Sequence, residues 1–193
     1  MKLVLISDTH GCQVGLPEGD VLIHAGDAFC GDDAASLRSD LRKFGALPHK
    51  TKLWVLGNHD LVLTHLLKTQ PETAWSLLKS AGIQLLIDDS VEIDGLRFYG
   101  VGWGTSVAIP TSDVIISHCP TKGTLDQRHP PDSEHLGSPA LAKQIEAVKP
   151  RVFVCGHIHG GYGRAEHHGT TYVNCSQANE ARQTVNKPWV LEI

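Results

Sequence analysis

The chain has 193 residues, 17 of them basic and 21 acidic, so that its formal charge is −4. This negative charge, and the absence of any run of residues of like charge, argue against a protein that binds duplex nucleic acid through a basic surface. An aromatic content of 6% argues against a platform for stacked bases. The length fits one ordinary domain, and we take residues 1–193 as a single unit.

No stretch approaches the roughly 20 consecutive apolar residues that a membrane span needs, and the N-terminal apolar run is too short for a signal peptide. The five cysteines are scattered and form no C-x-x-C pair; they are Cys12, Cys30, Cys119, Cys155 and Cys175. An odd, scattered set is typical of reduced thiols, so we expect a cytoplasmic protein that does not associate with a membrane.

The first half of the chain alternates short apolar runs with amphipathic stretches. The runs at 3–6, 21–24 and 52–56 are rich in branched residues and predict strands. Asp32 or Asp33 is expected to cap a helix that runs to about Phe44, and Pro71 is expected to open a second helix that stops at Gly82.

The second half is richer in strands. Asp94-Gly95 predicts a hairpin turn, and Ser138-Pro139 predicts the start of a helix that ends before Pro150. Residues 119–137 have no periodicity and three prolines, which predicts a long loop. Further strands are expected at 83–87, 91–93, 96–101, 114–117, 152–155, 171–174 and 189–193. The alternation indicates an α/β protein.

Residues able to bind a metal follow five of these strands directly. Asp8 and His10 come two positions apart after the first strand, so their side chains point to the same side of an extended chain. Taken alone, this pair also fits a surface turn. The same plan recurs at four other strand ends, however, with Asp27, Asn58 beside His59, His118, and His157 with His159. The repetition favours a ligand site at one edge of a sheet.

Seven donors are more than one zinc site uses. Structural zinc has four ligands, mostly thiolates, whereas mixed oxygen and imidazole donors suit two divalent ions that share a carboxylate. The ligand set is Asp8, His10, Asp27, Asn58, His118, His157 and His159. We expect Mn²⁺ first, with Fe, Zn, Ni, Co and Mg as alternatives. Such a pair of ions activates a water for attack on a phosphate, and neither a G-x-S-x-G elbow nor a Walker lysine motif is present.

Five blocks of the sequence resemble the motifs of the calcineurin-like metallophosphoesterase family, in the family's order: Asp8-x-His10, Gly26-Asp27, Gly57-Asn58-His59-Asp60, His118 and Gly156-His157-x-His159. The surrounding D-V-L-I-H-A-G-D, R-F-Y-G-V-G-W and G-H-I-H-G-G-Y-G also resemble its short metallophosphoesterase-domain-containing subgroup, some members of which act on cyclic nucleotides. One departure is Cys119-Pro120-Thr121, where the subgroup usually has Gly-Pro-Pro.

The resemblance implies a fold of two facing mixed β-sheets flanked by helices, a four-layer sandwich. It also implies roles for the site residues. Asp8, His10 and His159 would hold the first metal, and Asp27 would bridge. Asn58, His118 and His157 would hold the second metal. His59 would protonate the leaving oxygen, and Asp60 would orient the His59 ring.

Three further residues are candidates for substrate contacts. Trp103 either borders the site and stacks a base or belongs to the core. Arg128 and His135 lie in the long loop, where they either reach a substrate phosphate or base or are simply solvated.

The sequence thus predicts a two-metal phosphodiesterase that acts on small, including cyclic, nucleotides or similar diesters through a metal-bridging hydroxide. A phosphomonoesterase or a nuclease of the same chemistry, and an inactive binding module, are the alternatives. All seven ligands are present, which disfavours an inactive module, and the negative charge disfavours long nucleic acid as a substrate.

Overall fold

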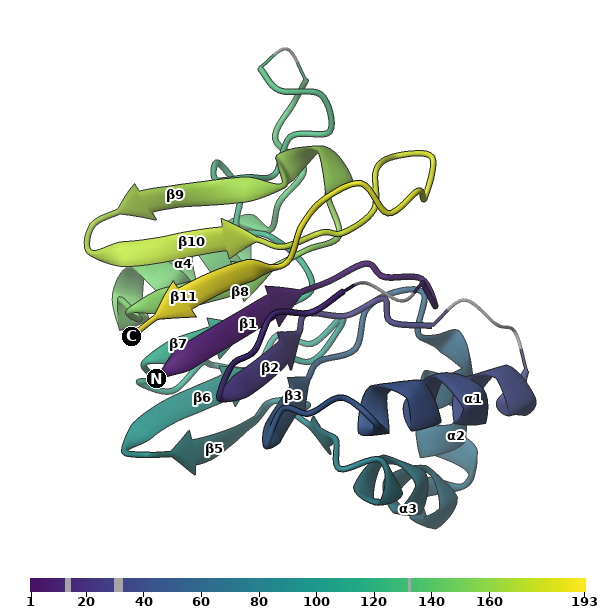
Figure 1. Ribbon diagram of the computed structural model, residues 1–193. Coiled ribbons are helices and arrows are strands. Elements are labelled where there is room, and N and C mark those ends of the chain that lie inside the picture. Colours follow the sequence, from purple (N-terminus) through teal and green to yellow (C-terminus); the bar gives the residue numbers. More distant parts are fainter. Residues whose placement is uncertain (13–14, 30–32, 132) are drawn as a thin grey trace.

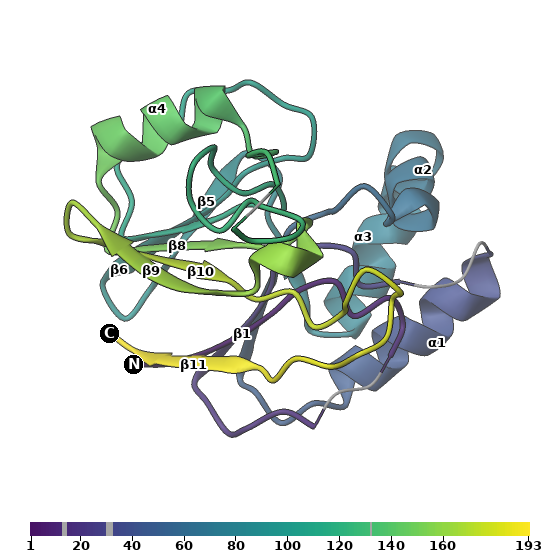
Figure 2. The ribbon, with the colours of Figure 1, turned by 90° about the horizontal axis from the view of Figure 1, so that it is seen from above.

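The computed structural model describes residues 1–12, 15–29, 33–131 and 133–193. In that part of the chain two mixed β-sheets lie face to face, and helices cover their outer faces (Figures 1 and 2). This confirms the expected α/β sandwich. Among these residues, no helix is both long enough and apolar enough to cross a bilayer.

The first sheet has the strand order β11-β1-β2-β3-β4. Its strands are β1 (Lys2–Ile6), β2 (Val21–His24), β3 (Thr51–Trp54), β4 (Gln84–Leu85) and β11 (Trp189–Glu192). All neighbours are parallel except β11, which pairs antiparallel with β1. The carboxyl ends of β1, β2 and β3 therefore meet at one edge.

The second sheet has the order β5-β6-β7-β8-β10-β9. Its strands are β5 (Asp89–Ile93), β6 (Leu96–Gly100), β7 (Val114–Ile116), β8 (Val152–Cys155), β9 (Gly163–His167) and β10 (Thr170–Asn174). The four central strands are parallel, and the two edge strands are antiparallel to their neighbours.

The described residues form four α-helices that flank the sheets: α1 (Ala34–Gly45), α2 (Leu61–Thr69), α3 (Pro71–Ser80) and α4 (Pro139–Val148). The first three pack on the outer face of the first sheet, around Trp54, and α4 packs on the second sheet, against Phe153 (Figure 2). The four layers are therefore helices, sheet, sheet and helix.

The main core lies between the two sheets. Leu3 and Leu5 of β1 face it, whereas Val4 and Ile6 face the opposite side of the strand. Both faces of β1 are buried, because helices or loops cover the outer face. This is why β1 is an unbroken apolar run rather than an alternating one.

Most expected elements are present with shifted ends. Asp33 caps α1, its side chain accepting hydrogen bonds from the amides of Ala35 and Ser36, both at 2.8 Å; the alternative cap, Asp32, lies outside the described residues. The Asp94-Gly95 turn joins β5 and β6 as expected, with both residues at positive φ. Residues 119–131 and 133–137 contain no helix or strand, only isolated bridges.

Candidate metal centre

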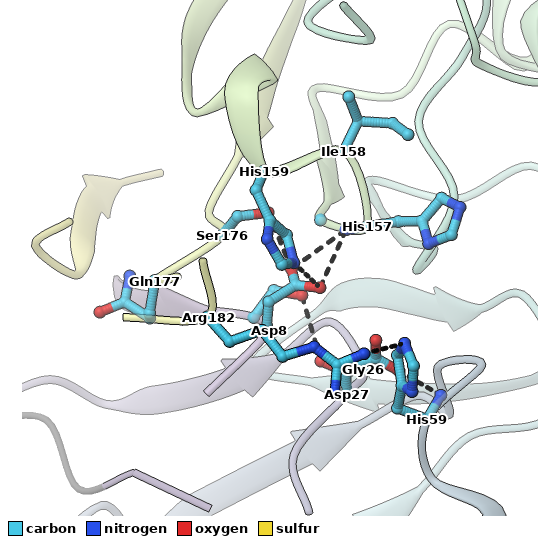
Figure 3. A network of polar contacts seen from close by, with 12 residues as sticks. Asp8, Gly26, Asp27, His59, His157, Ile158, His159, Ser176, Gln177 and Arg182 are labelled. Atoms are coloured by element: carbon cyan, nitrogen blue, oxygen red, sulfur yellow. Dashed lines mark hydrogen bonds and ion pairs between the residues drawn. The ribbon is translucent and has the colours of Figure 1, made fainter. Parts of the chain in front are cut away.

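The predicted ligands gather where the parallel strands of both sheets end. An isolated parallel bridge between Ser7 and Ser176 joins the chain after β1 to the chain after β10. It brings the ends of the two sheets together, so that residues distant in sequence share one cluster (Figure 3).

Asp8 is fully buried at the centre of this cluster. Its Oδ2 accepts hydrogen bonds from the Ser176 hydroxyl at 2.8 Å and from the His157 amide at 3.0 Å. Its Oδ1 lies 3.3 Å from Nε2 of His159. Burial opposes ionisation of this carboxyl, but the His159 hydrogen bond and the nearby imidazoles outweigh it and hold the pKa of Asp8 well below its usual range.

Asp27 and His118 form the second half of the cluster. Oδ1 of Asp27 accepts the His59 amide at 2.7 Å, and its Oδ2 lies 3.4 Å from Nε2 of His118. Nδ1 of His118 donates to the carbonyl of Ala25 at 2.7 Å, and Nε2 lies 3.0 Å from Oδ1 of Asn58.

Two of the predicted imidazole ligands, His118 and His159, are oriented in the way that metal ligands are. A histidine that binds a metal through one ring nitrogen usually donates the other N–H to a carbonyl or carboxylate. His118 does so to Ala25, and His159 does so to the carbonyl of Asn179, with Nδ1 and oxygen 2.8 Å apart. In both rings Nε2 is then the nitrogen that faces a carboxylate of the cluster.

Within the described ranges, two groups of donor atoms lie close enough together to hold an ion. Asp8, His10 and His159 form one group, and Asp8, Asp27 and His118 form the other; within each group the ligand atoms lie within 4.8 Å of one another. Asp8 is common to both. The role of Asp27 as the bridging ligand therefore stays a prediction.

The buried donors fit a cation. Nε2 of His10 is buried and has no hydrogen-bond partner among the described residues, which costs free energy unless something binds it. Nε2 of His118 faces oxygens of both Asn58 and Asp27, an arrangement that requires either a proton or a metal ion between them. Burial alone would lower the pKa of His118, but its hydrogen bond to Asp27 and the charge of Asp8 raise it to about 9. A divalent ion would replace that proton.

The His157 ring is in neither group. It lies beside the rings of His118 and Trp103, with centroids 5.0 and 5.1 Å away, while its backbone amide binds Asp8 (Figure 3). Burial lowers the pKa of His157 to about 4, so that the ring is neutral, as a ligand must be.

The backbone at the centre is conformationally strained. Asp8, His10, Asp27 and His157 all have positive φ, between 44° and 66°. Such conformations are uncommon for residues other than glycine and cluster at functional sites. The packing is also tight, because a Cβ at Gly156 would overlap the side chains of Ser7 and Asp8.

The structure corrects the expected role of Asp60. Its carboxylate makes no hydrogen bond to the His59 ring; it accepts four backbone amides instead, and it is fully buried. These amides belong to Asp27, Ala28, Phe29 and Gly57. Burial, together with the charge of Asp27, raises the pKa of Asp60 to about 6, against the effect of these hydrogen bonds. Asp60 thus shapes the loops that carry Asp27 and Asn58.

His59 lines a cleft of about 240 Å³ that several of the predicted metal ligands also line. The cleft wall also includes Arg128, which forms an ion pair with Glu180 at 3.4 Å. Trp103 is 41% exposed and packs edge-on against His118, in a neighbouring hollow of about 220 Å³. His135 is not at the cleft wall; its ring pairs with the buried carboxylate of Asp126, which also binds the amides of Gly123 and Gly137.

Sequence reasoning missed the segment after β10. Ser176 binds Asp8, the Asn179 carbonyl orients His159, and Arg182 reaches the His59 ring. The side-chain amide of Asn174 donates to the carbonyls of Leu125 and Ile158, which holds the loop after β8. The sequence did contain a signal for this segment. A strand was expected at 171–174, and polar residues follow it, as they follow the strands that carry the predicted ligands.

Comparison with known proteins agrees with this architecture. A sequence model of the family described as calcineurin-like phosphoesterase matches residues 1–161. Metallophosphoesterase domain-containing protein 1 of Homo sapiens is 32% identical over 237 aligned positions, which cover 100% of this chain and 71% of that protein.

Two solved structures show the same fold at low sequence identity. Phosphopantetheinyl hydrolase from Mycobacterium tuberculosis superimposes with a TM-score of 0.60 at 16% identity, over 94% of this chain and 90% of that one. An archaeal phosphodiesterase gives a TM-score of 0.53 at 16% identity, over 99% of this chain and 100% of the other. The extent of the family match and the identity with the human relative establish that the chain belongs to the calcineurin-like phosphoesterases, a family of metal-dependent phosphoester hydrolases.

Proposed function

We propose that this protein is a two-metal phosphodiesterase that hydrolyses small diesters, cyclic nucleotides among them. The observation that carries the proposal is the pair of donor groups around Asp8, in which buried carboxylates and imidazoles lie within 4.8 Å of one another. Family membership supports phosphoester hydrolysis in general. The number of ions and the diester preference are our inference.

The proposed ligands divide between two ions. Asp8, His10 and His159 hold the first, and Asn58, His118 and His157 hold the second, with Asp27 as the bridging carboxylate. Oxygen and imidazole donors in this mixture favour Mn²⁺ or a similar transition ion over Mg²⁺, which accepts imidazole poorly. When bound, such ions supply Lewis acidity toward a phosphate and lower the pKa of water.

His59 is the proposed general acid. It lines the cleft, and its backbone amide donates to Asp27, which keeps the residue next to the predicted ligands. The alkoxide of a ribose is a poor leaving group that must be protonated as the P–O bond breaks. A proton donor in this position typically contributes about 10²–10⁴-fold to the rate.

The dimensions of the cleft favour a small substrate. Its volume of about 240 Å³ is below the roughly 300–1,000 Å³ of pockets that enclose drug-sized ligands. It therefore suits a phosphoryl group and part of one alcohol. The formal charge of −4 disfavours a long polyanion.

A panel of substrates tests the proposal. Protein stripped with a chelator and reloaded with Mn²⁺ is offered an aryl phosphodiester, cyclic nucleotides, nucleoside monophosphates and single-stranded DNA. We expect the small diesters to be hydrolysed fastest and DNA to be hydrolysed poorly. A preference for monoesters would overturn the diester assignment. Absence of turnover on every ester, in protein shown to hold its metal, would indicate a binding module instead.

A further inference from the structure

A tight turn after β10 is held to the metal centre by its backbone. The Asn179 amide donates to the carbonyl of Gln183 at 2.9 Å, and the Arg182 amide donates back to the carbonyl of Asn179 at 2.8 Å. The Asn179 side chain accepts the amides of Ala181 and Gln183. The carbonyl of Asn179 also accepts Nδ1 of His159 at 2.8 Å. The turn is therefore positioned by a predicted metal ligand.

This turn directs Arg182 into the cleft. The residue has a φ of 58°, and its side chain extends to the His59 ring, where Nη2 lies 3.2 Å from Nε2 (Figure 3). Arg182 lines the same cleft as Asp27 and Asn58. A guanidinium has five N–H donors and no acceptor, so Nε2 of His59 accepts this hydrogen bond.

In the part of the chain that the structure describes, Arg182 forms no ion pair. Arg128, the other arginine of the cleft, is paired with Glu180 at 3.4 Å. Among the described residues, Arg182 has no carboxylate within 4.0 Å, and its hydrogen-bond partner is an imidazole. An unpaired guanidinium beside predicted metal ligands has the planar donor geometry that matches two oxygens of a phosphate.

We propose that Arg182 is a substrate-binding residue of this enzyme, and that its guanidinium binds a non-bridging oxygen of the scissile phosphate. The inference rests on the proposed function, because it takes the cleft to be the phosphoester site. In the absence of substrate, the guanidinium is bound to His59. An entering phosphate replaces the His59 ring as the hydrogen-bond partner of the Arg182 guanidinium.

The test measures phosphate binding and does not depend on turnover. Inorganic orthophosphate is titrated calorimetrically into Mn²⁺-loaded wild type, R182Q, R182K and R164Q. Arg164 is the matched control: it lies on β9 and is paired with Glu166 at 2.6 Å, so R164Q makes the same charge change outside the cleft. Metal content is measured for each protein.

We expect R182Q to bind orthophosphate about 10–100-fold more weakly, as the loss of a hydrogen bond between charged groups predicts. R182K keeps the positive charge but loses the paired N–H donors of the guanidinium. Its affinity for orthophosphate is therefore expected to lie between those of wild type and R182Q. R164Q should bind as wild type does. Metal content should be unchanged, since the His159 contact is made by the backbone of Asn179.

Two results would overturn the inference: R182Q binding orthophosphate within twofold of wild type, or R182Q losing its metal, which would make Arg182 a support of the centre. Failure of the proposed function looks different. In that case Mn²⁺-loaded wild type hydrolyses no ester, while the dependence of orthophosphate binding on Arg182 is still measured.

Discussion

The carboxylate of Asp60 accepts the backbone amide of Asp27 at 2.9 Å, and the same oxygen accepts the amide of Gly57 at 2.8 Å. One buried side chain therefore ties together the loops after β2 and β3, which carry two of the predicted ligands. Its hydrogen bonds fix the geometry of these two loops.

Asp60→Asn is expected to destabilise the protein although it conserves shape. An amide offers one oxygen where the carboxylate offers two, and each carboxylate oxygen accepts two amides, so two buried backbone N–H groups lose their acceptor. We expect a loss of about 2–4 kcal/mol in the free energy of unfolding, together with weaker Mn²⁺ binding. Urea denaturation and metal analysis measure the two effects. Asp33→Asn is the control, because asparagine caps a helix as well as aspartate does, and it should change neither quantity.

Gly156→Ala is expected to disable the centre through a single methyl group. Its Cβ would overlap Oγ of Ser7 and Oδ2 of Asp8, both fully buried. Relief of such overpacking typically costs about 1–3 kcal/mol and would displace Asp8. We expect at least tenfold weaker Mn²⁺ binding by calorimetry. Gly15→Ala, where a Cβ meets nothing within 4 Å, should bind metal normally. Equal metal affinity in both variants would contradict the importance of this close approach.

His59→Gln is expected to separate two kinds of substrate. A ribose alkoxide needs a proton as it leaves, whereas a nitrophenolate does not. Turnover of cyclic nucleotides should therefore fall about 10²–10⁴-fold, while nitrophenyl diesters are largely spared. Metal content should stay at the wild-type value, because the bond from His59 to Asp27 is made by the backbone amide. Equal losses on both substrates, with the metal retained, would rule out the acid role.

Trp103→Ala tests whether the indole stacks a base. Trp103 is partly exposed and lies against His118, so a nucleotide held at the centre can reach it. Stacking of a base on an aromatic side chain is worth about 1–3 kcal/mol, so KM for nucleotides should rise about 5–100-fold. KM for a dialkyl phosphate should not change. Trp75→Ala, on the exposed face of α3, is the matched control. A similar change in KM for both substrates would mean that Trp103 only packs against the ligand loops.

The sequence predicted the strands that carry the ligands because each is a short apolar run that ends abruptly in a polar residue. The helix α2 was missed for a physical reason. Its N-cap position is Asp60, whose side chain makes no capping hydrogen bond and instead binds backbone amides of the loops after β2 and β3. The strand β9 was missed because it is a polar edge strand, with only half-buried and exposed residues.

The candidate site, like the fold, could be predicted from the sequence only in part. Side chains that could bind a metal were identifiable at the strand ends, because the residue type alone determines whether a side chain can donate to a metal. The contacts that orient them were not, since Ser176 and Asn179 reach Asp8 and His159 through the pairing of β10 with β8 and the bridge between Ser7 and Ser176. The role of Asp60 depended on four backbone amides, which no side-chain pattern reveals.

The most direct test of the two-metal account is an activity titration. Chelator-stripped protein receives Mn²⁺ in known molar equivalents, and hydrolysis of an aryl phosphodiester is measured at each point. We expect no activity without metal, a rise that ends at two equivalents for each chain, and a constant rate beyond that ratio. Full activity in the stripped protein, or a maximum reached at one equivalent, would contradict the account.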